Sequence, residues 1–144
     1  MALVPDLAQR LAGAPDLVTC AQRCCDVLVK HGYVLPSLYV RRSGRLRCLA
    51  SNGYWQVLDG FPEESGVIAA TVRSDRAQLV EVEHCAEYLT AAPSVVAEAC
   101  VPIRFDGQVV GALNVESTSP FPRDVLADLE EIACLLYTSD AADE

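Results

Sequence analysis

The stretch AEACVPIRF-DG-QVVGALNVES, residues 97–117, decides the fold. Two apolar runs flank Asp106-Gly107, and an Asp-Gly pair between such runs is a strong hairpin signal, because both residues can adopt the positive φ of a type I′ turn. Counting outward from the turn pairs Phe105 with Gln108. Pro102 cannot donate to a strand ladder, which suggests an edge or a bulge. Neither face of the hairpin is mainly polar, so both need cover and a three-layer domain follows.

The same count predicts which side chains of the hairpin share a face. It places Ala99 opposite Asn114 and groups both with Ala112, whereas Glu98 and Glu116 lie on opposite faces. Two carboxylates on opposite faces of a sheet cannot act on one substrate as an acid–base pair. We therefore interpret these two as solvated or backbone-bonded carboxylates at strand ends.

Length, charge and composition exclude several classes of protein. A chain of 144 residues, 51% hydrophobic and 22% charged, is long enough for one globular domain. Its formal net charge of −9 argues against binding to nucleic acid or to anionic membranes. No apolar run has the length of a membrane span, and no signal-peptide pattern is present. The seven cysteines then suit a reducing cytoplasm, as free thiols.

Hydrophobic periodicity and turn residues predict helices near both ends of the chain and strands between them. The predicted helices are Pro5–Ala12, Pro15–Lys30, Val67–Arg73 and one from about Arg123, and the further strands are Leu38–Arg42, Leu46–Ser51 and Gln78–Val82. This order indicates an α+β sandwich. We expect a mostly antiparallel sheet of five to six strands, with terminal helices on one face and short helices and loops on the other.

The last eleven residues, CLLYTSDAADE, differ in character from the rest of the chain. They closely resemble the translation of a sequencing adapter, and we expect residues 134–144 to be a non-native tail. Residues 1–14 then form a lead helix and linker, and residues 15–133 form the domain, with a truncated last helix. Whatever followed residue 133 in the natural protein is expected to be missing.

Several short motifs resemble those of a GAF domain in their order and spacing. The resemblance covers roughly residues 17–133, and its motifs are Gly66-Val67-Ile68-Ala69, Leu79-Val80-Glu81-Val82, Val101-Pro102-Ile103, Asp106-Gly107, Val110 to Ser117 and Phe121-Pro122. It implies the GAF-like fold described above. It also implies a sensory and dimerising module that holds a small molecule beneath the sheet and signals through its terminal helices.

On this resemblance we expect a non-catalytic, small-molecule-sensing domain of a bacterial signalling protein. The resemblance further implies a homodimer through the terminal helices and an output domain in cis, such as a histidine kinase or a diguanylate cyclase. The signatures of the cyclic-nucleotide and bilin branches are absent, and His84 lies too early to match the haem-binding branch. No cofactor and no catalytic residue is therefore expected.

The candidate ligand site combines small and aromatic residues. Alanines on the hairpin leave room for a ligand, and aromatic side chains can wall it. The candidates are Tyr39, Tyr54, Trp55, His84, Tyr88, Ala99, Ala112 and Asn114. Close helix packing against the alanines, with an ordinary aromatic core, is the open alternative.

The cysteines motivate an enzymatic alternative. One GAF branch, the free methionine-(R)-sulfoxide reductases, places a cysteine in the helix-opening segment, where this chain has Ile68. Cys85 alone does not supply that constellation, although Cys48, Cys85 and Cys100 could meet in space. We expect a sensor and keep the thiol reductase as the alternative.

Three further cysteines lie within the predicted first long helix. Cys20 and Cys24 share its apolar stripe with several aliphatic residues, and Cys25 follows directly. We interpret them as buried small hydrophobes and expect no metal site. The unbroken amphipathic pattern from Leu17 to Leu28 also motivates a third reading, a ligand-free dimerisation module.

Overall fold

The computed structural model of the chain describes residues 1–53, 61–62, 66–81 and 94–136. The helices are α1 (Leu3–Leu11), α2 (Leu17–Lys30), α3 (Val67–Ser74) and α4 (Val125–Leu136). The strands are β1 (Val34–Arg42), β2 (Arg45–Ser51), β3 (Phe61–Pro62), β4 (Gln78–Glu81), β5 (Ala97–Phe105) and β6 (Gln108–Ser117). The short strand β3 is the one element here that the sequence did not predict.

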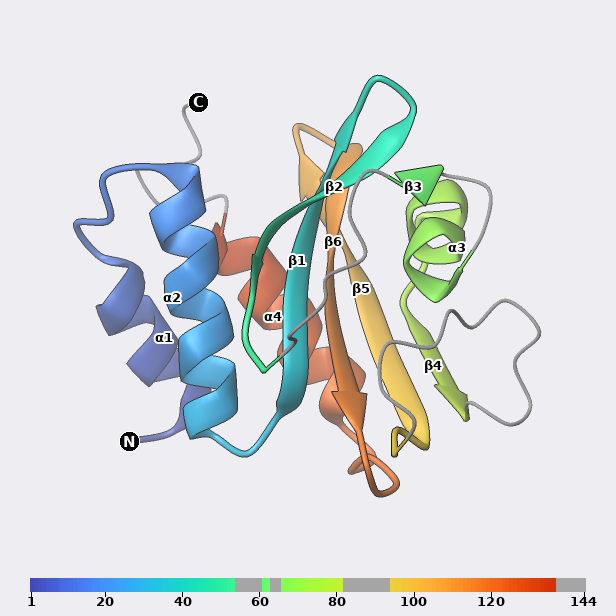
Figure 1. Ribbon diagram of the computed structural model, residues 1–144. Coiled ribbons are helices and arrows are strands. Elements are labelled where there is room, and N and C mark those ends of the chain that lie inside the picture. The colour runs from blue at the N-terminus through green and yellow to red at the C-terminus, as the bar shows by residue number, and fades with distance from the viewer. Residues whose placement is uncertain (54–60, 63–65, 82–93, 137–144) are drawn as a thin grey trace.

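The six strands form one sheet in the order β3-β2-β1-β6-β5-β4, and every neighbouring pair is antiparallel. Helices α1, α2 and α4 lie on one face of this sheet, and α3 lies on the other (Figure 1). The predicted α+β sandwich of three layers is confirmed. None of the described helices is long and apolar enough to cross a membrane.

The central hairpin turns where its sequence predicts. Asp106 and Gly107 have φ values of +52° and +75°, as a type I′ turn requires, and Phe105 pairs with Gln108. Beyond the next pair the predicted register is wrong, because Val110 is an extra residue between the partners of Arg104 and Ile103. This bulge moves every later residue of β6 to the opposite face from the one predicted.

Gly111 adjoins the bulge and needs to be a glycine for steric reasons. A Cβ atom added to Gly111 would lie 2.0 Å from the backbone carbonyl oxygen of Tyr39 on β1. Pro102 is accommodated on the other strand of the hairpin, because β4 pairs only with residues 97–100 of β5 and ends before the proline. Pro102 has no backbone N–H to donate, and no residue of β4 lies opposite it.

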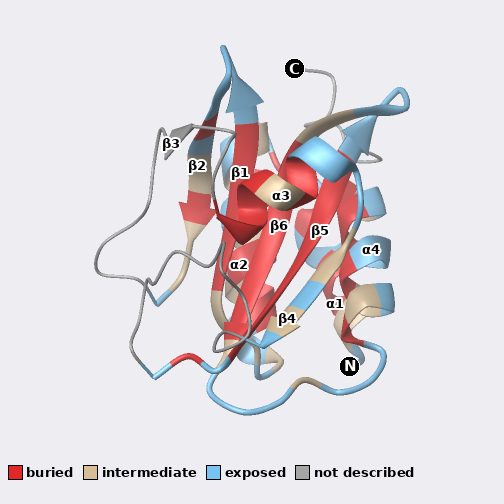
Figure 2. Cartoon of the chain, turned by 90° about the vertical axis from the view of Figure 1, so that its right-hand side faces the viewer, coloured by how far each residue is buried: buried red, intermediate tan, exposed pale blue. Residues whose placement is uncertain are grey.

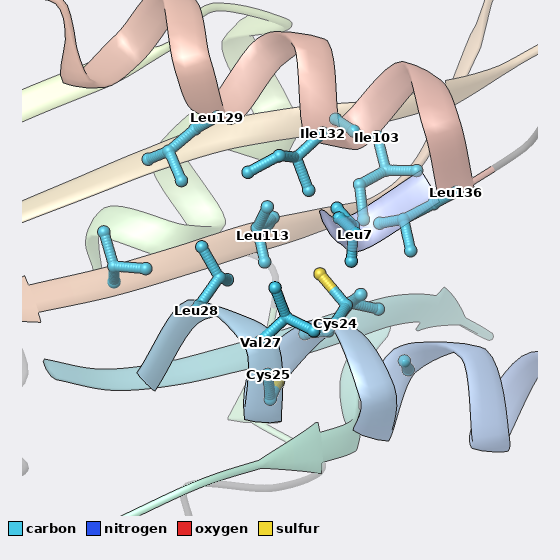
Figure 3. Close-up of a cluster of buried hydrophobic side chains, with 14 of the residues drawn as sticks. Leu7, Cys24, Cys25, Val27, Leu28, Ile103, Leu113, Leu129, Ile132 and Leu136 are labelled. Carbon is cyan, nitrogen blue, oxygen red and sulfur yellow. The ribbon is translucent and has the colours of Figure 1, made fainter. Parts of the chain in front are cut away.

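The face of the sheet toward α1, α2 and α4 carries the larger apolar core. Side chains from these helices and from β5 and β6 point toward one another in this layer, among them Leu7, Leu113 and Leu129 (Figure 3). Cys20, Cys24 and Cys25 are buried in the same core, as predicted. No group of three metal-ligating side chains occurs among the residues that the structure describes.

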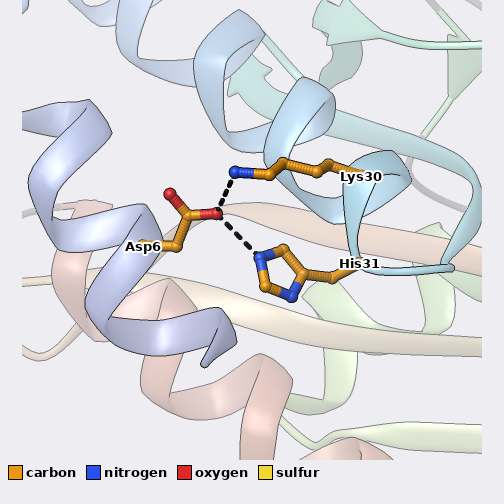
Figure 4. A network of polar contacts seen from close by, with 3 residues as sticks. All are labelled: Asp6, Lys30 and His31. Carbon is orange, nitrogen blue, oxygen red and sulfur yellow. Dashed lines mark hydrogen bonds and ion pairs between the residues drawn. The ribbon is translucent and has the colours of Figure 1, made fainter. Parts of the chain in front are cut away.

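Polar contacts fix the helices of this layer to one another and to the sheet. The Asp16 side chain caps α2 by accepting a hydrogen bond from the Thr19 backbone N–H at 2.7 Å. In α1, the buried Asp6 carboxylate contacts Lys30 Nζ at 2.9 Å and His31 Nε2 at 2.8 Å (Figure 4). These contacts hold the first helix against the C-terminal end of α2.

The face of the sheet toward α3 carries a smaller core. Buried residues of α3 pack against the middle of the sheet, as the burial colours of Figure 2 show. The cluster contains Tyr39, Leu46, Val67, Ile68, Ala69, Val72, Cys100 and Ala112. At the C-terminal end of α3, Arg104 Nε contacts Asp75 Oδ1 at 2.5 Å, and this contact links the C-cap of the helix to β5.

Candidate functional site

Buried polar side chains gather on the α3-facing side of β1, β5 and β6. Glu98 of β5 lies directly opposite Glu116 of β6, and Cys100 lies opposite Asn114, which in turn pairs with Ser37 of β1. Residues that alternate along a strand share a face, so these groups lie on the same side as Cys100 and Ala112 of the smaller core. We call Glu98 and Glu116 the carboxylate pair.

The carboxylate pair corrects a prediction made from the sequence. Glu98 and Glu116 were expected on opposite faces, and the bulge at Val110 instead brings them together. Both are buried, with 4% and 2% of their surface exposed, so they are not solvated groups at strand ends. Gly111, a glycine inside a strand, was the signal in the sequence that could have indicated this bulge.

The environment of Glu98 disfavours its charged form. Burial is the largest cause and the nearby Glu116 carboxylate is the second, and together they raise the pKa of Glu98 to about 8. A hydrogen bond from the Asn114 side chain acts in the opposite direction. Glu98 is therefore mostly protonated at neutral pH.

Asn114 also presents an acceptor at this site. Its side chain is buried, and its Oδ1 atom has no hydrogen-bond partner among the residues that the structure describes. A buried acceptor without a partner costs free energy, and a bound ligand that donates to it would remove that cost. The site thus offers acidic groups and a neutral acceptor.

Two thiols lie on the same side of the sheet. Cys100 is fully buried beside Asn114, and burial raises the pKa of its thiol strongly. A hydrogen bond with Thr71 of α3 lowers this pKa, but by less. Cys48 of β2 packs against the same core and is partly exposed, and its Sγ donates to the Ala50 carbonyl oxygen at 3.4 Å. None of the described cysteines forms a disulfide.

The structure brings together only part of the predicted ligand site. Tyr39, Ala112 and Asn114 lie on the α3-facing side. Ala99 does not, because the bulge places it opposite Val115 in the larger core, so grouping it with Ala112 was wrong. The other candidates, Tyr54, Trp55, His84 and Tyr88, lie outside the described residues, as do Cys85 and the tail after residue 136.

The sequence profile of the GAF domain family matches residues 16–136. This chain belongs to the GAF domain family. The match confirms the resemblance seen in the motifs of the central hairpin and includes all described elements except α1. No curated protein matches the chain.

Solved structures with the same fold include enzymes and GAF domains of other proteins. The type II free methionine-R-sulfoxide reductase of Thermoplasma acidophilum is 24% identical, with a TM-score of 0.77 over 85% of this chain and 96% of its own. The free methionine-R-sulfoxide reductase of Neisseria meningitidis, solved with its substrate, is 20% identical, with a TM-score of 0.88 over 94% of this chain and 84% of its own. The GAF domain of the Acinetobacter phosphoenolpyruvate-protein phosphotransferase is 14% identical, with a TM-score of 0.82 over 94% and 89%.

These similarities correct the expectation of a non-catalytic domain. Free methionine-R-sulfoxide reductases from two organisms share the fold of this GAF domain over most of its length. The same fold therefore occurs in GAF domains with and without a reductase name. The exclusion was wrong.

Proposed function

We propose that this GAF domain binds a free amino acid of the methionine sulfoxide type and reduces it with a thiol. The observation that carries the proposal is the buried carboxylate pair beside the thiol of Cys100, on the face of the sheet that α3 covers. The reductases of Thermoplasma acidophilum and Neisseria meningitidis, whose folds are similar, support the choice of substrate.

The carboxylate pair suits the ammonium group of a free amino acid. Two buried acidic groups directly opposite each other destabilise one another unless a proton or a cation lies between them. A primary ammonium has three donors, which matches two carboxylates and the neighbouring Asn114 Oδ1. Amino acids within a peptide chain lack this cation, so the site favours free amino acids.

The proposed reaction transfers the sulfoxide oxygen to a cysteine. The sulfoxide S–O bond breaks as an S–O bond forms on the cysteine sulfur, and the thiol proton ends on the transferred oxygen. The sulfoxide sulfur is reduced by two electrons to the thioether, and the cysteine sulfur is oxidised by two electrons to a sulfenic acid. A second thiol then condenses with the sulfenic acid to a disulfide and releases water. An external dithiol of the thioredoxin class reduces that disulfide and becomes oxidised. This chemistry requires a reducing compartment, so we place the protein in the cytoplasm.

Cys100 is the described thiol nearest in register to the carboxylate pair, and we assign the reacting sulfur to it. Because burial disfavours its thiolate, we infer that Cys100 gives up its proton only when the sulfoxide is bound. Ile68 stands where the reductase branch was expected to carry a cysteine, so the second thiol comes from another position. Cys48 on the same side of the sheet and Cys85 are the candidates for it.

The test is turnover of free L-methionine-(R)-sulfoxide with thioredoxin, thioredoxin reductase and NADPH. We expect turnover that Cys100→Ser lowers at least about 100-fold, since the nucleophile is lost. Cys134→Ser, an exposed cysteine of α4, serves as the control and should keep full activity. Absence of turnover by the unmodified protein would overturn the proposal. The predicted homodimer and output domain stay predictions.

A further inference from the structure

We propose that three arginines at the tip of the β1–β2 hairpin bind an acidic segment of a partner protein. They are Arg42 of β1 and Arg45 and Arg47 of β2, and we call them the arginine patch. The inference goes beyond the proposed function and does not depend on it, because the patch contains no cysteine and neither residue of the carboxylate pair.

The register of the hairpin places the three arginines on one side of the sheet. Arg42 lies directly opposite Arg45, across a two-residue turn with φ values of +51° and +73°. Arg47 is two residues from Arg45 along β2, so both lie on the same side. Leu46 between them belongs to the smaller core on the α3-facing side. The arginine patch therefore lies on the other side, that of α1, α2 and α4.

The tip of this hairpin projects beyond the helices into solvent (Figures 1 and 2). All three arginines of the patch are exposed. In the part of the chain that the structure describes, none of their guanidinium groups forms a hydrogen bond or an ion pair. Sites for small molecules are concave, whereas a projecting turn is convex. The tip therefore suits the surface of a larger partner.

Positive charge is concentrated at this tip in a chain that is negative overall. Residues 34–51 contain four arginines and no acidic residue, whereas the whole chain has a formal net charge of −9. Arg42 and Arg45 are directly opposite, so their Cβ atoms are about 4.5–5.5 Å apart, and like charges in such a pair destabilise a hairpin. Local rules of stability are expected to fail at functional sites. The pairing of two arginines thus indicates a binding role.

The charge of the chain also selects the kind of acidic partner. A guanidinium group binds carboxylates and phosphates with two parallel hydrogen bonds. Nucleic acids and anionic membranes extend beyond the tip, so the net charge of −9 repels them. A short acidic segment of a protein meets only the positive tip. Exposed ion pairs are individually weak and screened by salt, so several carboxylates must bind together and the affinity must fall as salt is added.

Fluorescence anisotropy with a fluorescein-labelled peptide of alternating glutamate and aspartate, in about 20 mM salt, tests the proposal. Arg42→Gln/Arg45→Gln should weaken binding about tenfold. Arg10→Gln/Arg123→Gln is the matched control, because it removes two exposed arginines outside the hairpin and changes the net charge equally. The control should weaken binding less than about twofold. Absence of binding by the unmodified protein, or equal losses in the two variants, would overturn the inference.

The same experiment distinguishes other partners. Single-stranded DNA and phosphatidylserine vesicles should bind more weakly than the peptide, and tighter binding of either would overturn the choice of an acidic protein segment. Sedimentation velocity in low salt tests a second copy of this chain as the partner. Self-association that is lost in Arg42→Gln/Arg45→Gln would likewise overturn that choice.

Thermal unfolding tests whether the pairing of Arg42 with Arg45 costs stability. Arg45→Gln should raise the melting temperature in about 20 mM salt, and the gain should shrink in about 1 M salt, which screens the repulsion. Arg123→Gln, at an exposed arginine before α4, is the control and should show no such gain. A variant that is more stable and yet binds the peptide less tightly would support the proposal. A lower melting temperature for Arg45→Gln would show that the arginines stabilise the hairpin and would overturn it.

Discussion

The two faces of the central hairpin come from the same strands and differ sharply in chemistry. On the side of α1, α2 and α4, β5 and β6 present Val101, Ile103, Leu113 and Val115 to an apolar core. On the side of α3 the alternate positions present Glu98, Cys100, Asn114 and Glu116, all buried. On the face toward α1, α2 and α4, burial of apolar side chains stabilises the fold. On the face toward α3, burial removes polar groups from water, which costs free energy.

This difference indicates where selection for stability and selection for function act. A fold that needed only stability would gain by replacing the carboxylate pair with apolar residues, since such replacements are often neutral or stabilising. Local rules of burial are expected to fail at functional sites. The larger core should therefore govern stability, and the face toward α3 should govern binding.

Leu113→Ala tests the stabilising role of the larger core. Leu113 is fully buried, so the truncation leaves a cavity and should lower the free energy of unfolding by about 2–5 kcal/mol. Urea unfolding followed by circular dichroism measures the change. Leu79→Ala, at a leucine of β4 that is 47% exposed, is the control and should cost well under half as much. Equal losses in the two variants would contradict the assignment of the core.

Local rules predicted the turn, the layers and the cysteines of the core. Asp106-Gly107 supplies its own turn geometry, and the spacing of Cys20 and Cys24 places both on one helical stripe. The register was not predicted in this way. Gly111 is a local hint of a bulge, but the close approach of its backbone to Tyr39, which is distant in sequence, can be seen only in the structure.

The error in register carried over to the candidate site. A shift of one residue exchanges the faces of a strand. The predicted register therefore placed Glu98 and Glu116 on opposite faces, although they lie opposite each other on one face, and it placed Ala99 and Ala112 on one face, although they lie on different faces. Asn114 was chosen as a candidate together with Ala99, whereas its neighbours in the structure are Ser37 and Cys100.

Gly111→Ala tests whether the bulge maintains the difference between the faces. The added methyl would collide with the Tyr39 carbonyl oxygen, and overpacking of this kind costs about 1–3 kcal/mol. The loss of stability should be accompanied by weaker binding of the sulfoxide, because β6 carries Asn114 and Glu116. Gly44→Asn is the control, at a turn with open space and a φ of +73° that asparagine tolerates. An unchanged midpoint of unfolding for Gly111→Ala would show that β6 can shift freely.

Glu98→Gln tests the cost of polar burial on the face toward α3. The raised pKa means that the folded protein binds more protons than the unfolded chain between about pH 4.5 and 8, so this group lowers stability as pH rises through that range. The variant should match the unmodified protein near pH 4, below the pKa of the unfolded carboxyl, and be more stable by about 1 kcal/mol or more at pH 8. Urea unfolding at both pH values measures this, and a variant that is less stable at pH 8 would contradict it.

Asp6→Asn tests how much the buried Asp6 carboxylate stabilises the folded protein. Asp6 lies at the edge of the larger core, whose other buried residues are apolar. Hydrogen bonds from His31 and then Lys30 lower the pKa of Asp6 to about 2, so the folded state favours the charged form. Stability from this group is present above the pKa of an unfolded aspartate, near 4, and is lost as the pH falls toward 2. Asp6→Asn should therefore lower the melting temperature at pH 6, and the difference from the unmodified protein should shrink between pH 4 and pH 2. Glu130→Gln, at an exposed carboxylate of α4, should show little change at either pH. A difference for Asp6→Asn that stays constant down to pH 2 would mean that α1 is held by Leu7 and Leu11 alone, and that the face toward the helices owes nothing to its buried charge.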